Sequence, residues 1–444
     1  MKKVLGVSAL TLIAACLIAP KFIATKYETT VTDIVANINK EKGYSATIES
    51  TESSWFGSKS KVLLSFDLNS IDPTMQSQIV SAEFTLDTHY GPLLLSDQGK
   101  IGLFSTNIQL QGEKQREYLV WDEKSPLYNA AIVSNLFGKI SFADKIPAFK
   151  DKNNEFSVTE YAGKGTIGHD KTIYNGGFKS AKMDITEATT IQDLSIALNL
   201  KADWDTIQRG GFYDADMSFK VGKVVRVPQG EMNGLAVTVH TKLDKKQQLG
   251  NIQMSYSAKN IDVANFKAHD LKLVTEINRL DNQIFIDYAK LIKESDALPV
   301  DQQVAFFLNN MQSIIDGKPE LNITELSGST KDGHFTASMT SKLADMATKP
   351  TGAQLYNPKF WLYNAIIDAN IEADQTLVTR AVVQYAAKQM PASATSEDIQ
   401  KQSTMLLDSF VNQGLIKISD DKYISTFHAE KGQGHVYDLT IPLM

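Results

Sequence analysis

The sequence is poor in the residues that build disulfides, metal centres and nucleic-acid sites. It contains one cysteine, Cys16, which excludes an intramolecular disulfide and a cysteine-based zinc site. Its seven histidines stand apart from one another, without the spacing of metal ligands. The 51 acidic residues outnumber the 45 basic ones, whereas nucleic-acid-binding proteins normally carry a basic face. We therefore expect no metal, no cofactor and no nucleic-acid partner.

What the chain does contain is typical of a folded protein. Apolar residues make up 43% of the 444 residues and charged residues 22%, which is the balance of a chain that can bury a core. The length exceeds that of an ordinary domain. Because no Gly/Ser-rich or Pro-rich linker interrupts the sequence, an elongated single body is as consistent with it as separate domains.

A long apolar segment follows Lys2 and Lys3 at the N-terminus. Residues 4–24 number 21, which is roughly 30 Å of helix and enough to cross a bilayer. The two lysines favour an N-terminus in the cytoplasm and export of the remainder. We therefore expect a retained membrane anchor over residues 1–25, with these side chains in the bilayer: Val4, Leu5, Val7, Leu10, Leu12, Ile13, Leu17 and Ile18.

Two other interpretations of this segment stay open. Residues 13–16 resemble a lipobox, so Cys16 is a candidate lipidation site of a lipoprotein. Alternatively, the small residues Ala14 and Ala15 could serve a signal peptidase and yield a soluble form. In each case the body of the protein lies outside the cytoplasm.

An amphipathic helix is expected directly after the anchor, over residues 26–40. Its apolar positions follow helical spacing, and Lys42-Gly43 ends it. The stripe consists of Tyr27, Val31, Ile34, Val35 and Ile38.

From about residue 44 to residue 279 the dominant hydrophobic period is two, which predicts β-strands with one apolar and one polar face. Such strands are expected at 45–54, 61–69, 79–90, 100–111, 138–148, 194–201, 213–221, 235–239, 252–258 and 271–277. The candidate apolar face for a ligand or partner is formed by Met217, Phe219, Val237, Val239, Met254 and Tyr256.

Helical periodicity returns in two pairs, near 280–316 and 375–413, and strands are expected at 320–341, 359–373 and 414–442. The predicted fold is a β-rich α+β protein: an extended or curved antiparallel sheet of long strands, with two helical hairpins packed on it and a single N-terminal membrane helix before it. The expected regions are the anchor (1–25), the amphipathic helix with the β body (26–279), and an α+β region (280–444).

The motifs give little support for catalysis. Residues 163–168 read G-x-G-x-x-G, but no helical period follows, as a dinucleotide site would require, so glycine-rich strands and turns are the better interpretation. No G-x-S-x-G, H-E-x-x-H, P-loop or calcium-loop pattern occurs. We predict that the protein is not an enzyme.

Two short motifs stand out in the first quarter of the chain. Trp55 and Phe56 lie within Ser53–Ser58, an aromatic turn with flanking small residues, and His89, Gly91 and Pro92 follow an expected strand, with Tyr90 between the first two. These segments resemble the aromatic turn and the His-Gly-Pro segment of the YdgA-like proteins, a family of unknown function attached to the envelope of Gram-negative bacteria. The resemblance implies an envelope location and a similar architecture, but no activity.

Together these features predict a protein held on the inner membrane by one pass, with its body in the periplasm. The leading hypothesis is a binding or scaffold module whose one-sided sheet forms a groove for a lipid or acyl chain. One alternative is a closed protein that acts through its surface or through self-association as a homo-oligomer. A less favoured alternative is an envelope hydrolase, which would need polar side chains converging in a cleft.

Overall fold

The computed structural model describes residues 2–70, 79–96, 99–154, 157–178, 183–186, 188–264, 266–294, 299–346, 350–391 and 394–443. For residues 2–17, as for a few others, the description covers the backbone only. The chain forms two compact units: unit 1 comprises Met1–Arg209 and Lys290–Leu298, and unit 2 comprises Gly210–Ala289 and Pro299–Met444. The boundary expected between residues 279 and 280 marks a predicted change from strands to helices. The two units, by contrast, are defined by which residues lie close together in space.

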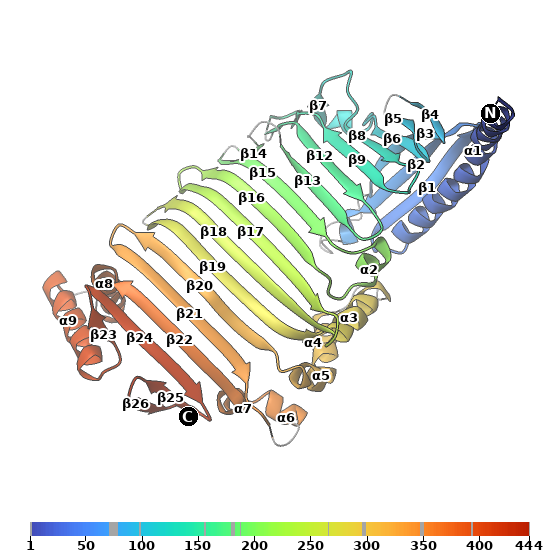
Figure 1. Ribbon diagram of the computed structural model, residues 1–444. Coiled ribbons are helices and arrows are strands. Elements are labelled where there is room, and N and C mark those ends of the chain that lie inside the picture. The colour runs from blue at the N-terminus through green and yellow to red at the C-terminus, as the bar shows by residue number, and fades with distance from the viewer. Residues whose placement is uncertain are drawn as a thin grey trace. The chain divides into compact units, whose positions relative to one another are not determined.

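Unit 1 is built on an antiparallel sheet in which neighbouring strands follow the order β1–β2–β3–β6–β8–β9–β12–β13–β15 (Figure 1). These strands are β1 (Tyr44–Ser53), β2 (Gly57–Asp67), β3 (Ile79–Tyr90), β6 (Phe104–Leu110), β8 (Tyr128–Ser134), β9 (Ile140–Ile146), β12 (Tyr161–Ile167), β13 (Thr172–Phe178) and β15 (Thr189–Leu200). The shorter elements are β4 (Leu93–Ser96), β5 (Gly99–Ile101), β7 (Leu119–Trp121), β10 (Phe149–Asp151), β11 (Ser157–Val158), β14 (Met183–Thr186) and α2 (Trp204–Arg209).

One long helix, α1 (Lys2–Ile38), precedes the sheet and packs against β1, β2 and β3 (Figure 1). Its last part confirms the amphipathic helix expected after residue 26. The Asn39 side chain then accepts a hydrogen bond from Ala46 N (2.6 Å) and donates one to Ala46 O (2.9 Å). This pair of bonds ties the end of the helix to the first strand and so fixes the direction of α1 over the sheet.

The expected membrane anchor forms the first part of α1. The side chains of Cys16 and of the anchor residues up to Leu17 lie outside the described residues, and Ile18 is 56% exposed. Within the described part of the chain, no helix is both long enough and apolar enough to span a membrane.

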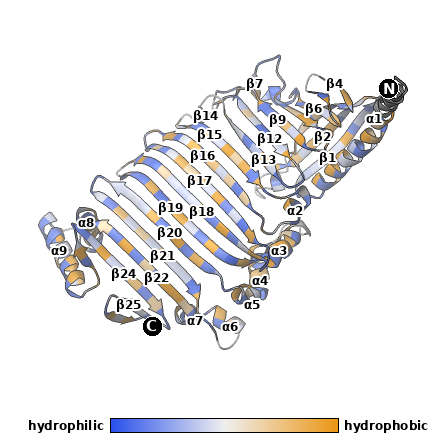
Figure 2. Ribbon diagram, viewed as in Figure 1, coloured by the Kyte–Doolittle hydropathy of each residue, from blue (hydrophilic) through white to orange (hydrophobic). Residues whose placement is uncertain are grey.

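Unit 2 confirms the expected antiparallel sheet of long strands. The order of neighbours is β16–β17–β18–β19–β20–β21–β22–β24–β25–β26, with β23 also paired to β24. The strands are β16 (Ala215–Arg226), β17 (Gly230–Asp244), β18 (Leu249–Val263), β19 (Phe266–Asp281), β20 (Glu320–Thr330), β21 (Gly333–Leu343), β22 (Ala365–Asp374), β23 (Lys417–Ser419), β24 (Lys422–Glu430), β25 (Gln433–Val436) and β26 (Leu439–Pro442). Hydrophobic and hydrophilic residues alternate along the long strands, as Figure 2 shows.

The helices of unit 2 confirm one expected pair and correct the other. The pair near 375–413 is α8 (Gln375–Gln389) and α9 (Ser396–Asn412); α8 contacts β21, β22 and β24, and α9 packs on α8. For the region near 280–316 the sequence predicts a pair of helices, but its described residues form three, since α4 ends where α5 begins. The Asn310 amide donates to the carbonyl of Phe306 (2.9 Å), and its own backbone leaves helical geometry. These helices are α3 (Asn282–Glu294, of which 282–289 belong to unit 2), α4 (Val300–Asn309) and α5 (Met311–Asp316).

The strand expected at 359–373 begins later than the sequence indicated. Residues 358–364 form a helix, α7 (Pro358–Asn364), after the short α6 (Gly352–Leu355), and β22 begins only at Ala365. The reason lies in the start signals: the Asn357 side chain accepts a hydrogen bond from Lys359 N (3.0 Å), and Pro358 occupies the first helical turn. These signals override the strand-like apolar pattern of the residues that follow.

The first two glycines of the G-x-G-x-x-G string, Gly163 and Gly165, lie on β12 between β9 and β13, and Gly168 follows the end of that strand. A Cβ at Gly165 would overlap the Phe142 ring and the Ile173 carbonyl, and one at Gly163 would overlap Asp144 and the Tyr174 ring. The two strand glycines therefore make room for aromatic rings from neighbouring strands. This confirms the glycine-rich strand interpretation, since β13 and not a helix follows.

We predict that Gly165→Ala lowers the free energy of unfolding by about 1–3 kcal/mol, the usual cost of overpacking. Gly168→Ala is the matched control from the same string. A Cβ at Gly168 would lie 3.5 Å from the nearest atom, the carbonyl oxygen of Lys171, so the change should stay within about 0.5 kcal/mol. Urea denaturation curves measure both, and equal midpoints for the two variants would contradict this account of the motif.

Candidate functional site

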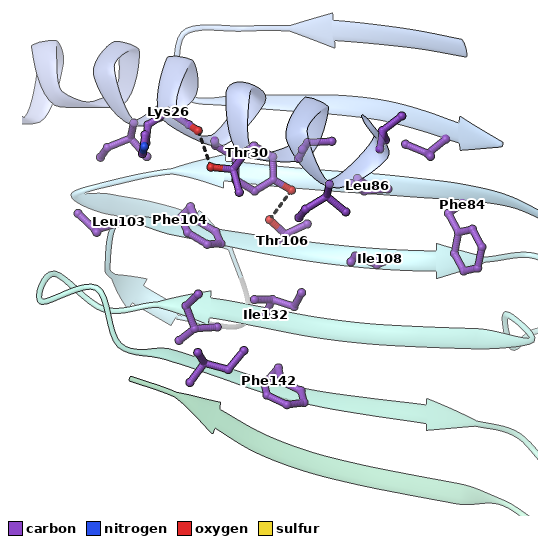
Figure 3. A pocket seen from close by; sticks show the side chains of 18 of the residues that line it. Lys26, Thr30, Phe84, Leu86, Leu103, Phe104, Thr106, Ile108, Ile132 and Phe142 are labelled. Carbon is purple, nitrogen blue, oxygen red and sulfur yellow. Dashed lines mark hydrogen bonds between the residues drawn. The ribbon is translucent and has the colours of Figure 1, made fainter. Parts of the chain in front are cut away.

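An open apolar cavity of about 800 Å³ lies between α1 and the sheet of unit 1 (Figure 3). We call it the α1 groove. On the helix side it is lined by Phe22, Ile23, Lys26, Tyr27, Thr30, Val31, Ile34, Val35 and Ile38. On the sheet side it is lined by Ala46, Val62, Leu64, Phe84, Leu86, Leu103, Phe104, Thr106, Ile108, Ile132, Ile140, Phe142 and Ile167.

Strand alternation and register produce the floor of the groove. Residues two apart on a strand share a face, and directly opposite residues of antiparallel strands share it too. Leu86 of β3 is opposite Ile108 of β6, and Thr106 of β6 is opposite Ile132 of β8, which in turn is opposite Phe142 of β9. These pairs join β3, β6, β8 and β9 into one continuous, largely apolar face, and lining residues from β1, β2 and β12 extend it on both sides.

The helix covers this floor without sealing it. Leu86, Ile108, Ile132 and Phe142 are only half-buried, and Ile34 of the helix stripe is 51% exposed. Side chains of a closed core are packed on all sides. The groove therefore leaves apolar surface of both helix and sheet in contact with solvent, which is the usual mark of a binding surface.

One buried group of hydroxyls joins the helix to the floor. The Tyr27 hydroxyl accepts hydrogen bonds from Thr88 Oγ1 (3.1 Å) and Thr106 Oγ1 (3.0 Å), and the two threonine hydroxyls are 3.1 Å apart. Thr88 and Thr106 are each 1% exposed. Burial raises the pKa of Tyr27, so its hydroxyl stays neutral and bonded over the physiological range.

A second tyrosine closes the floor beside this contact. Tyr90 is fully buried, its ring meets that of Tyr27 edge to face at 5.8 Å, and its hydroxyl lies 2.7 Å from Ser58 Oγ. Burial raises the pKa of Tyr90 to about 12, a shift that the hydrogen bond to Ser58 opposes. The end of the groove near Tyr27 is thus anchored by neutral hydroxyl groups.

The groove carries a single charge. Lys26 is the one charged residue among those that line it, and Figure 3 shows it at the end of the groove where Leu103 and Phe104 lie. Lys26 is exposed, and in the described residues no carboxylate pairs with its ammonium group.

Comparison with known proteins assigns the chain to a family. Over residues 1–444 the sequence matches the bacterial proteins of unknown function called DUF945. The chain belongs to DUF945. This agrees with the YdgA-like resemblance, which also indicated a family without known function. No curated protein and no solved structure matches the chain.

The family-motif residues of this DUF945 protein meet at one end of unit 1. Trp55 and Phe56 form the turn between β1 and β2 and are 54% and 37% exposed. Phe56 O accepts a hydrogen bond from Tyr90 N (2.7 Å), which brings the turn to the end of β3. Gly91, next along the chain, donates from its backbone N to Leu103 O (2.7 Å), and Pro92 O accepts from Gly102 N (3.1 Å).

His89 does not face the groove. It alternates with the buried Thr88 and Tyr90 on β3, so its side chain is on the opposite face of the sheet, with Nε2 3.9 Å from Asp87 Oδ1. Among the described residues no group of three or more His, Cys, Asp or Glu side chains is placed to hold a metal ion.

The candidate apolar face from the sequence lies in unit 2 of the DUF945 fold. Its six residues do meet across β16, β17 and β18: Met217 is opposite Val239, which is opposite Met254, and Phe219 is opposite Val237, which is opposite Tyr256. Phe219 and Tyr256 are 44% and 41% exposed. The α1 groove is lined by other residues, all from unit 1.

Sequence reasoning found the helix wall of the groove but missed most of its floor. The five residues of the predicted stripe, Tyr27 to Ile38, all line the groove. Thr88, Thr106 and Tyr90 were missed because single polar residues within a strand give no signal of a contact with a helix some 60 to 80 residues earlier.

We predict that Tyr27→Phe weakens the docking of α1 by about 1 kcal/mol, the usual contribution of a buried hydrogen bond. Amide hydrogen exchange of residues 27–38 should accelerate in this variant. Tyr118→Phe is the control, since Tyr118 is 70% exposed and does not line the groove, and it should leave exchange unchanged. Unaltered exchange in Tyr27→Phe would show that the hydroxyl contact does not hold the helix.

Proposed function

We propose that this protein is a non-enzymatic binding module of the bacterial cell envelope and that the α1 groove holds the acyl chains of a lipid. The observation that carries the proposal is an open cavity of about 800 Å³ whose lining is apolar apart from two threonines, a tyrosine and Lys26. This volume lies within the range of small-molecule sites, ~300–1,000 Å³. Each methylene that moves from water into such a site contributes roughly 0.8 kcal/mol.

The chemistry of the lining favours binding over a reaction. The hydroxyls that line the groove already have hydrogen-bond partners: Thr106 donates to Tyr27, and Thr30 donates to the backbone carbonyl of Lys26. The lone charge is an ammonium group at one end. A hydrolase would need a nucleophile and a base within hydrogen-bonding reach of each other and of the substrate. An acyl chain requires only an apolar surface of matching length.

We also propose that the first part of α1 anchors the protein in the inner membrane, with both units in the periplasm. The apolar segment 4–24 behind Lys2 and Lys3 supports this location.

We expect the intact protein in the membrane fraction, and its body to be digested when protease is added to spheroplasts. Recovery of the intact chain from the cytosol would contradict the proposed location, and a diacylglyceryl adduct in the intact mass would replace the anchor with a lipidated Cys16.

Lipid binding is testable by photocrosslinking in cells that have been labelled with radioactive acetate. With p-benzoylphenylalanine in place of Ile108, on the floor of the groove, we expect radiolabelled lipid to become attached to the protein monomer. The same photoreactive residue in place of the exposed Tyr118 is the control and should capture little lipid. Leu86→Trp fills the groove and should reduce capture at position 108 several-fold, whereas Val237→Trp, in unit 2, should not.

A second candidate, self-association through the surface, is favoured by the exposed aromatic residues Phe219 and Tyr256 of unit 2. In the crosslinking experiment it predicts a covalent dimer from a photoreactive residue at Tyr256, and no lipid at Ile108. Labelled monomer at Ile108 supports the lipid proposal, and its absence contradicts it.

A further inference from the structure

The single positive charge in the α1 groove indicates which lipid head group the groove would prefer. This inference rests on the proposed function. Lys26 is exposed at one end of an otherwise apolar lining (Figure 3). By contrast, Lys61 of the same unit, on the opposite face of the sheet, lies 2.7 Å from Glu83 Oε1. No described carboxylate has that relation to Lys26, so its ammonium group is available to an anionic ligand.

The neighbours of Lys26 confine such a ligand to one orientation. Leu103 and Phe104 lie at the same end of the groove as Lys26 in Figure 3, while Phe84 lies at the other end of the floor. An anionic head group placed at Phe84 would find no cation among the lining residues there to compensate for lost hydration. A head group at Lys26 keeps contact with solvent and gains an opposite charge, and its chains then extend toward Phe84.

The dimensions of the groove match two acyl chains better than one. Its helix wall extends from Phe22 to Ile38, which is roughly 24 Å at 1.5 Å per residue. One leaflet of a bilayer, by comparison, is about 15 Å of hydrocarbon. At ~30 Å³ for a group the size of a water molecule, the cavity has room for roughly 27 methylene-sized groups. A single chain of ordinary length would leave much of this apolar surface in water.

We infer that the α1 groove binds an anionic diacyl glycerophospholipid, with its acyl chains along the helix and its phosphate paired with Lys26. The apolar lining supplies most of the affinity and accepts the chains of any lipid. Lys26 supplies the preference for a net negative head group, because in a zwitterionic lipid the cationic group of the head group competes for the same phosphate.

The test uses the full-length protein in phosphatidylcholine vesicles that carry a trace of a photoactivatable lipid. Phosphatidylglycerol and phosphatidylcholine with identical photoreactive acyl chains are compared, and a photoreactive fatty acid forms the third arm. Crosslinked peptides are identified by mass spectrometry, and only those from the floor of the groove are counted. We expect phosphatidylglycerol to exceed phosphatidylcholine by roughly threefold, as an exposed ion pair would give, and the ratio to fall at high salt.

Lys26→Glu should abolish this ratio or invert it, and Lys26→Ala should reduce it toward one. Lys21→Glu is the matched control, because Lys21 is an exposed lysine of the same helix that does not line the groove, and it should leave the ratio unchanged. All three changes are on the exposed surface of the helix, so the fold should be retained.

The outcomes separate the two proposals. Equal crosslinking of both phospholipids in the groove of the wild-type protein would overturn the head-group inference and leave lipid binding intact. The head-group inference would also be overturned if Lys21→Glu changed the ratio of phosphatidylglycerol to phosphatidylcholine crosslinking as much as Lys26→Glu does. Stronger crosslinking by the fatty acid than by phosphatidylglycerol would overturn the two-chain assignment. Absence of groove crosslinks with every lipid would overturn the proposed function itself.

Discussion

The contact between the Tyr27 hydroxyl and the threonine pair, Thr88 and Thr106, sets the position of α1 over the sheet of unit 1. Two threonine hydroxyls buried in an apolar face need a partner, since an unsatisfied buried hydroxyl costs about 1–3 kcal/mol. Tyr27 provides that partner at the end of a long, rigid side chain. Tyr27 therefore ties this part of the helix to the sheet, in addition to the packing of α1 against β1, β2 and β3 and to the bonds between Asn39 and Ala46. Where the aliphatic stripe continues, toward Ile38, the space between helix and sheet stays open as the groove.

Strand alternation keeps the polar and apolar chemistry of unit 1 on separate faces. Lys61 and Glu83 pair on one face, while Val62 and Phe84, next to them in sequence, line the groove on the other. The same principle places His89 away from the groove although both of its neighbours in sequence face the helix. An ionisable residue can thus lie one position from the binding face without taking part in it, which is why the histidine of the family motif carries no role in the groove.

The sequence predicts the periodic parts of this protein and not the contacts between distant elements. The stripe on α1 and the long strands of unit 2 were predictable because many residues repeat one spacing, and α9 because Thr395 and Gly414 mark its ends. The error at α7 has a local cause, since Asn357 and Pro358 start a helix within an apolar run that otherwise resembles a strand.

The location of the cavity was beyond prediction for a different reason. The apolar face of unit 2, from Met217 to Tyr256, and the floor of the groove, from Leu86 to Phe142, have the same alternating pattern of apolar and polar residues. Only the packing of α1 distinguishes the two faces. Which set of strands a helix packs against depends on contacts between residues far apart in the sequence, and these leave no periodic pattern. The glycines at 163 and 165 are a similar case: their role depends on rings of Tyr174 and Phe142, which belong to neighbouring strands.

The place of Lys26 along α1 links the groove to the proposed anchor. Residues 4–24 form the apolar segment, and Lys26 follows it by two positions, so in an anchored protein this lysine would be at the level of the lipid head groups. The groove begins about one helical turn before this lysine, at Phe22, and follows the helix away from the bilayer. A lipid in the adjacent leaflet and a lipid in the groove would therefore place their phosphates at similar heights. Entry into the groove would move the acyl chains from one apolar surface to another without carrying the charged group through either, which removes the largest electrostatic cost of extracting a lipid from a membrane.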